Sequence, residues 1–154
     1  MCLILAGKVG SNIASEIGTM RVTQQIDALE IMGINSASYL ILPKIMGLIT
    51  IMPCLVVFSS AMGIVGAYAT AYIGHIMTPD DLTIGLQHNF NSWFVWMSII
   101  KSLFFAFIIS SVPAYFGYSV EGGSVDVGKA STNAVVSSSA LILFSDVFLT
   151  QLLS

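Results

Sequence analysis

Several sets of residues in this sequence have types and spacings that could support chemistry. One is the run GSVDVGKA at 123–130, which fits the G-x-x-x-x-G-K part of a phosphate-binding P-loop. A P-loop next needs a Ser or Thr hydroxyl for magnesium, and Ala130 has none. It also follows a buried strand, whereas this run follows an apolar segment that is long enough for a membrane helix. We therefore expect a Gly-rich loop with an interfacial lysine and no nucleotide site.

Lys101 is a second candidate, because it lies inside an apolar segment that runs from 91 to 118. An ionised side chain deep in a bilayer costs about 2.5–3.5 kcal/mol unless something compensates its charge. Lys101 could face a polar cavity and attract an anionic group such as a lipid phosphate, or its stem could carry the ammonium to the interface. Asp146 also lies in an apolar segment and is the natural ion-pair partner, which would make the pair mainly structural. The sequence leaves these alternatives open.

Asp27 and Glu30 are separated by one helical turn, a spacing that could suggest a metal site or a general acid pair. No His lies near them, so an exposed acidic face, or one that docks a partner, is the better interpretation. His75 and His88 flank a polar connection and are interpreted as ordinary interfacial residues. The serines at 137–139 are better suited to helix packing than to nucleophilic catalysis. We expect no enzyme activity, metal or cofactor on this chain.

The amino-acid composition indicates whether the surface of this chain faces water or lipid. Of 154 residues, 56% are hydrophobic and 8% are charged, and the mean hydropathy is +0.90. A soluble domain carries about a quarter charged residues, so most of this surface must meet lipid or protein. The net charge of -3 comes with no basic stripe, which gives nucleic-acid binding no electrostatic basis. Cys2 and Cys54 lack metal-ligand spacing and are interpreted as small apolar residues.

The apolar segments predict an all-α integral membrane protein with about three full transmembrane helices plus the end of an earlier one. The expected elements are the end of a membrane helix at 1–17, a short amphipathic helix at 18–35 that stops at Gly33, spans at 43–75, 91–118 and 131–153, and a Gly-rich loop at 119–130. All belong to a single domain over 1–154. Pro53 is expected to kink the first span.

Small residues recur along the first span, at Ser59 and Gly63 and then at Gly66, Thr70 and Gly74. Such spacing lets helix backbones approach closely in lipid, where association depends on packing. We therefore expect this small-residue stripe to face another helix.

The basic residues predict the orientation. Lys8, Arg21, Lys44 and Lys129 lie on the sides of the amphipathic helix and the Gly-rich loop, whereas the connection at 75–91 has no Lys or Arg. The positive-inside rule therefore places the amphipathic helix and the Gly-rich loop in the cytoplasm.

Two ordered blocks of residues make the chain recognisable. The first contains GKVGS at 7–11, EIGTM at 16–20, TQQIDAL at 23–29 and MG at 32–33. The second contains GY at 117–118, GG at 122–123, VGKAST at 127–132, AVV at 134–136 and Asp146. Together they resemble the signature of the MlaE family of permeases from lipid-transporting ABC systems. The run IKS at 100–102 is also similar to an intramembrane lysine of that family, which favours the lipid-binding interpretation of Lys101.

The resemblance implies that the stretch over 16–33 is a cytoplasmic coupling helix that sits in a groove of a separate ABC ATPase subunit. The residues that it assigns to this contact are Glu16, Gly18, Thr19, Met20, Arg21, Gln25, Asp27, Leu29, Glu30, Met32 and Gly33. It also implies a homodimer with a second permease copy and an MCE-domain lipid-binding subunit. The implied function is movement of phospholipid or a related lipid between the inner membrane and the outer envelope. The implied location is the bacterial inner (cytoplasmic) membrane, crossed several times.

Members of that family carry an amphipathic elbow helix and further membrane-helix sequence before the point where this chain begins. By this resemblance the given chain lacks the N-terminal part of the family pattern, as a fragment, through a misplaced start codon or in an incomplete gene. Two other classes remain open. An ion-coupled carrier would need paired broken helices and several buried carboxylates, of which only Asp146 qualifies. A non-transporting scaffold would need neither Lys101 nor a coupling helix.

Overall fold

The computed structural model describes residues 1–74, 79–89 and 91–153, and every element in this part of the chain is helical. In chain order the elements are α1 (Cys2–Leu5), the π-helix η1 (Ala6–Gly10), α2 (Ser11–Val22), α3 (Gln25–Ile31), α4 (Ser36–Gly74), α5 (Pro79–Asn89), α6 (Ser92–Tyr118) and α7 (Ser124–Leu153). Among the described residues, α4, α6 and α7 are the 3 helices long and apolar enough to cross a membrane. The predicted all-α membrane fold with three spans is confirmed.

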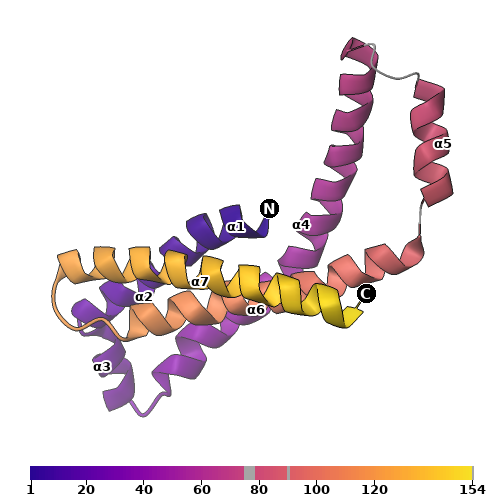
Figure 1. The fold of residues 1–154 in the computed structure, drawn as a ribbon. Helices are drawn as coiled ribbons and strands as arrows, with labels where there is room; N and C mark the ends of the chain where they lie inside the picture. Colours follow the sequence, from indigo (N-terminus) through magenta and orange to yellow (C-terminus); the bar gives the residue numbers. More distant parts are fainter. Residues whose placement is uncertain (75–78, 90, 154) are drawn as a thin grey trace.

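Helix α6 is at the centre of the bundle and packs against α2, α4 and α7 (Figure 1). Two apolar clusters hold these helices together. One joins η1, α4, α6 and α7 through Ala6, Met52, Phe105, Ala106, Ile109, Ile142 and Leu149. The other joins α2, α3 and α6 through Ile13, Ile17, Ile26 and Ala114. The second cluster fixes α3 to the end of the bundle, which matters for the site described below.

Helix α4 begins earlier than the sequence predicted. The expected span at 43–75 began at a proline, but the helix starts at Ser36 because Asn35 caps it, accepting a hydrogen bond from the Ser38 N–H at 3.3 Å. Beyond Met52 and Pro53 the helix turns away from α6 and α7 (Figure 1), as expected for a proline inside a helix. In this second half Ala71 is the one buried residue of α4 among those described.

The prediction of a loop at 119–130 is wrong beyond residue 123, because α7 already begins at Ser124. Gly122 turns the chain with φ +131, a backbone conformation that L side chains rarely adopt. The Asp126 carboxylate accepts from the Gly123 N–H at 3.4 Å and so caps the new helix. The last span is therefore longer than the predicted 131–153, and the Gly-Lys motif lies in its first turns. Such a helical segment cannot wrap around a phosphate as a P-loop does.

The connection expected at 75–91 also contains a helix, α5, whose last turn holds His88. His75 lies outside the described residues.

The single amphipathic helix expected at 18–35 is two helices in the structure. Residues 1–17, expected to end a membrane helix, continue through α1, η1 and α2 as one helical run to Val22. There the chain breaks, because Gln24 adopts a left-handed conformation with φ 59, and its N–H bonds the Arg21 carbonyl at 3.1 Å. Helix α3 follows and ends before Gly33, which has φ 79. Left-handed residues therefore flank α3 on both sides.

Candidate functional site

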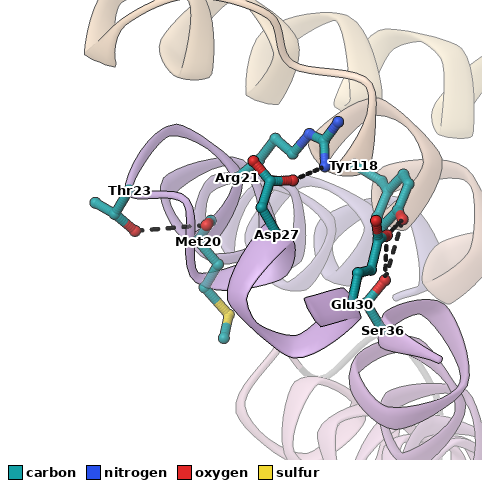
Figure 2. Close-up of polar contacts among 7 residues, drawn as sticks. All are labelled: Met20, Arg21, Thr23, Asp27, Glu30, Ser36 and Tyr118. Atoms are coloured by element: carbon teal, nitrogen blue, oxygen red, sulfur yellow. Dashed lines mark hydrogen bonds and ion pairs between the residues drawn. The ribbon is translucent and has the colours of Figure 1, made fainter. Parts of the chain in front are cut away.

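Side chains from four helices meet where α2 ends, α4 begins and α6 ends. We call this group, formed by Arg21, Asp27, Glu30, Ser36 and Tyr118, the α3 junction (Figure 2). Arg21 comes from the last turn of α2, Ser36 opens α4, and Tyr118 closes α6. The two carboxylates lie one turn apart on α3. Asp27 bonds to α2, whereas Glu30 bonds to α4 and α6.

Each carboxylate of α3 has its own partner in this junction. Arg21 Nη1 donates to Asp27 Oδ1 at 2.8 Å, and the Arg21 guanidinium lies 5.5 Å from the centroid of the Tyr118 ring. Glu30 Oε1 accepts from Tyr118 Oη at 2.9 Å and from Ser36 Oγ at 3.0 Å. Both hydroxyls therefore converge on one carboxylate oxygen, and Ser36 is itself buried. Arg21, in turn, ties Asp27 to the ring of Tyr118.

This geometry lowers the pKa of Glu30 below its ordinary 4.5, mainly because the Tyr118 hydroxyl donates to the carboxylate, then because Ser36 does, with a smaller effect of Arg21. A carboxyl with a lowered pKa stabilises the folded state fully above its unfolded pKa. That contribution disappears as the pH falls through the folded value.

We therefore expect the wild type to lose thermal stability relative to a Glu30→Gln variant as the pH is lowered from 6 to below about 4.5. The charged groups nearby are Arg21, which stays protonated, and Asp27, which both proteins retain. The difference between the thermal unfolding midpoints of the two proteins, measured in detergent over this pH range, reports the contribution of the Glu30 charge. A difference that does not depend on pH would contradict the role of the charged carboxylate.

The end of α3 presents apolar side chains to the outside. Ile31 is 87% exposed and Met32 is 65% exposed, and Ile34 lies beside them in the turn that leads to α4. We call these three residues the α3 tip. Ile26, near the start of the same helix, is fully buried in the second apolar cluster. Helix α3 is thus anchored by one apolar residue on its inner side and leaves an apolar tip unpaired within the chain.

A second polar group lies between the membrane helices α6 and α7. Lys101 Nζ donates to Asp146 Oδ1 at 3.1 Å and to Thr150 Oγ1 at 2.6 Å. The Lys101 side chain is 18% exposed and that of Asp146 is 53% exposed. The structure thus brings together the two intramembrane charges that the sequence singled out. An anionic headgroup would have to compete with Asp146 for this lysine.

Comparison with known proteins decides the family. The model of the family described as Permease MlaE matches residues 1–152. The chain belongs to the MlaE permease family. Probable ABC transporter permease proteins are among the similar curated proteins. The one from Rickettsia bellii is 42% identical over 97% of this chain and 58% of its own length, and the one from Synechocystis is 34% identical over 98% and 57%.

A more distant MlaE-type relative comes from a plant. The Arabidopsis thaliana protein named trigalactosyldiacylglycerol 1, chloroplastic, is 28% identical over 97% of this chain and 43% of its own length. The chain therefore spans somewhat more than half the length of the bacterial relatives it matches. Together with the three candidate spans, these matches identify a multi-pass membrane protein of the permease type.

The structure separates the residues that the MlaE resemblance assigned to coupling into two groups. Those on the outside, able to meet a partner, are Glu16, Thr19, Gln25, Glu30, Met32 and Gly33. Those wholly or partly covered by the chain itself are Gly18, Met20, Arg21, Asp27 and Leu29. Gly18, for example, faces Val127 of α7 and Val120, which follows α6. A Cβ added to Gly18 would lie 3.2 and 3.3 Å from the methyl groups of these two valines. Gly18 serves the packing of α2 and not an external contact.

The sequence did not single out several residues that shape this site. Ile31, the most exposed residue of the α3 tip, was not selected, although its position next to Met32 and Gly33 marks the helix end. Tyr118 could not be placed beside Glu30, because it is 88 residues away along the chain. Ser36 is close to Glu30 in sequence, but the turn between α3 and α4 that brings the two together was not predicted. Lys44 forms an ion pair with Glu16 and so ties α4 to α2. Only the fold brings these residues together.

Proposed function

We propose that this chain is the membrane-embedded permease part of an ATP-driven lipid transporter, and that the α3 tip docks its ATPase subunit. The observation that carries this proposal is the shape of α3. Within an MlaE-family chain, it is a short helix outside the spans, anchored inward by Ile26 and exposing Ile31 and Met32 outward. Apolar side chains exposed outside the lipid are typical of a surface that a partner covers.

The distribution of charge supports a cytoplasmic position for this end. Arg21 belongs to the α3 junction, and Lys44 pairs with Glu16 of α2. Helix α7, whose first turns contain Lys129, begins at the same end of the bundle (Figure 1). By the positive-inside rule these basic residues favour the cytoplasmic side, where ATP is available. In a bacterium this corresponds to the inner membrane.

Lipid is the substrate class that the proposal assigns. The bundle offers lipid-sized apolar surface, including the face of α7 formed by Leu143, Phe144, Val147 and Phe148. The name of the Arabidopsis relative contains that of a glycolipid. In this account a second permease copy and an MCE-domain lipid-binding subunit complete the transporter. An ion-coupled carrier is less well supported, because Asp146, the carboxylate it would use, is paired with Lys101.

An Ile31→Asp substitution tests the docking surface. Ile31 is almost fully exposed, so the charge should leave the fold intact, but an unpaired carboxylate at the centre of an apolar contact should weaken ATPase binding by about 2 kcal/mol or more, roughly thirtyfold. The measurement is co-purification in detergent of the complete permease with its cognate ATPase subunit.

The matched control is Ile84→Asp, an exposed isoleucine of α5 remote from α3. We expect this variant to retain the ATPase. Equal retention by the wild type and both variants would refute docking at the α3 tip. Absence of any ATPase from the wild-type preparation would refute the ABC assignment itself.

A further inference from the structure

Tyr118 contacts each of the other three helices that meet at the α3 junction. Its hydroxyl donates to Glu30 of α3 at 2.9 Å and lies 3.1 Å from the Ser36 hydroxyl, at the start of α4. Its ring lies under the Arg21 guanidinium of α2, at 5.5 Å. Tyr118 itself is the last residue of α6, the central helix of the bundle. One side chain therefore connects α6 with α2, α3 and α4 (Figure 2).

Helix α3 has few other attachments. Among its residues only Ile26 is buried, and left-handed residues, Gln24 and Gly33, flank it at both ends. A helix held at one apolar point can pivot about that point unless a second contact fixes its direction. The Arg21–Asp27 ion pair holds the first turn of α3 to α2. The bond from Tyr118 to Glu30 holds the opposite end of α3 to α6. It is charge-assisted, and such bonds are about twice as strong as neutral ones.

We propose that Tyr118 is the positioning residue through which a displacement of α3 reaches α6. This inference rests on the proposed function, since it takes the ATPase to be the source of that displacement. Without the bond to Tyr118, Ile26 and the Arg21–Asp27 pair would hold only the first turn of α3, and Ser36 would connect Glu30 to α4 alone. With Glu30 held by Tyr118, a push at the α3 tip is passed along the axis of α6 into the membrane. In this proposal Tyr118 passes the displacement of α3 to α6 and takes no part in docking the ATPase.

The test compares motion of α6 in the complete transporter with and without this hydroxyl. Cys2 and Cys54 are replaced with serine, and a single cysteine is placed in α6 by Trp96→Cys, an exposed position on the far side of the bundle. The rate of maleimide labelling is measured without nucleotide and after trapping with ATP and vanadate. Co-purification of the ATPase is recorded for every variant.

In the protein that retains Tyr118, we expect trapping to change the labelling rate at least about threefold. A change of this size corresponds to a coupling energy within the usual range. In Tyr118→Phe, which keeps the ring under Arg21 and loses only the hydroxyl, the change should fall to less than about one and a half-fold while the ATPase still co-purifies. Glu30→Gln tests the same bond from the other side and should behave alike. Tyr115→Phe, an exposed tyrosine of the same helix, is the matched control and should keep the full change.

Three results would overturn the proposal. The first is a full nucleotide-dependent change in both Tyr118→Phe and Glu30→Gln. The second is no change in the wild-type background although the ATPase is bound, because nothing would then reach α6. The third is loss of the ATPase in Tyr118→Phe, which would make Tyr118 a docking residue. Failure of every preparation to retain an ATPase would instead refute the proposed function, and this inference with it.

Discussion

Replacing Lys101 with methionine is expected to destabilise the folded chain in a membrane-like environment by about 3 kcal/mol. Methionine keeps most of the apolar stem but leaves Asp146 without its ammonium partner, at a position where the surroundings are lipid or protein. A charged side chain without a compensating partner is costly in such surroundings. The expected effect can be measured by unfolding with a denaturing detergent.

The partner substitution and the double variant show whether the effect belongs to the pair. Asp146→Asn should be destabilising too, because it leaves the Lys101 ammonium unpaired. The double variant leaves no unpaired charge and should recover most of the lost stability. Lys129→Met is the control: its ion pair with Asp126, at 3.5 Å, is exposed and should contribute less than about 1 kcal/mol.

A different pattern would favour the other interpretation of Lys101. If Lys101→Met left stability unchanged but abolished retention of phospholipid during purification, lipid binding by the lysine would be supported and the structural pair would not. A double variant as unstable as the worse single one would also contradict the pairing.

Gly117→Val is expected to have the second large effect, a loss of about 3 kcal/mol or more. Gly117 lies where α6 passes close to α2, and an added Cβ would lie 2.7 Å from the Ala14 carbonyl oxygen. The neighbour is backbone, which no rotamer change can move aside, so the two helices would have to separate. The adjacent Tyr118 would then be displaced from Glu30 as well. Folded yield in detergent and the unfolding midpoint both report this change.

Gly63→Val provides the comparison. Gly63 also lies in a membrane helix, but no atom lies within 4 Å of where its Cβ would be. Valine there should change stability by less than about 1 kcal/mol. Similar losses for both variants would show that helix preference, and not the contact with Ala14, decides the outcome.

These two glycines also show what the sequence could and could not predict. The small-residue stripe on α4 was expected to face another helix, yet Gly63 and Gly66 have nothing near them within this chain. Among the glycines described, those inside helices that closely approach another part of the chain are Gly10, Gly18 and Gly117, which do not form a regular stripe. Spacing along one helix indicates that a close approach is possible, but the choice of partner depends on the packing of all the helices.

The number of spans could be predicted well, because hydrophobic length is a direct requirement of the bilayer. Boundaries were less certain where short polar groups act locally. Asn35 starts α4 ahead of Pro43, Asp126 and Gly122 start α7 within the expected loop, and Gln24 divides the expected coupling helix. A non-glycine residue in a left-handed conformation has no reliable signal in the sequence.

The candidate site, too, could be predicted only in part from the sequence. A helical turn relates Asp27 and Glu30, so the sequence could place them on one short helix. Two of the residues that bind them, Arg21 and Ser36, are close in sequence, but Tyr118 is 88 residues from Glu30 and reaches it only through the fold. Lys101 and Asp146 could be named as a possible pair because isolated charges in apolar segments are rare. Whether the lysine has a further role in lipid binding is a property of the assembled transporter.

The most direct test of the central claim is to ask which protein touches the α3 tip. A photoreactive amino acid placed at Ile31 in the complete permease, co-expressed with its ATPase and irradiated in intact membranes, should form a cross-link to the ATPase subunit. The same amino acid at Ile84 should not. Cross-links from position 31 to lipid or to a second permease copy, with none to the ATPase, would contradict the account.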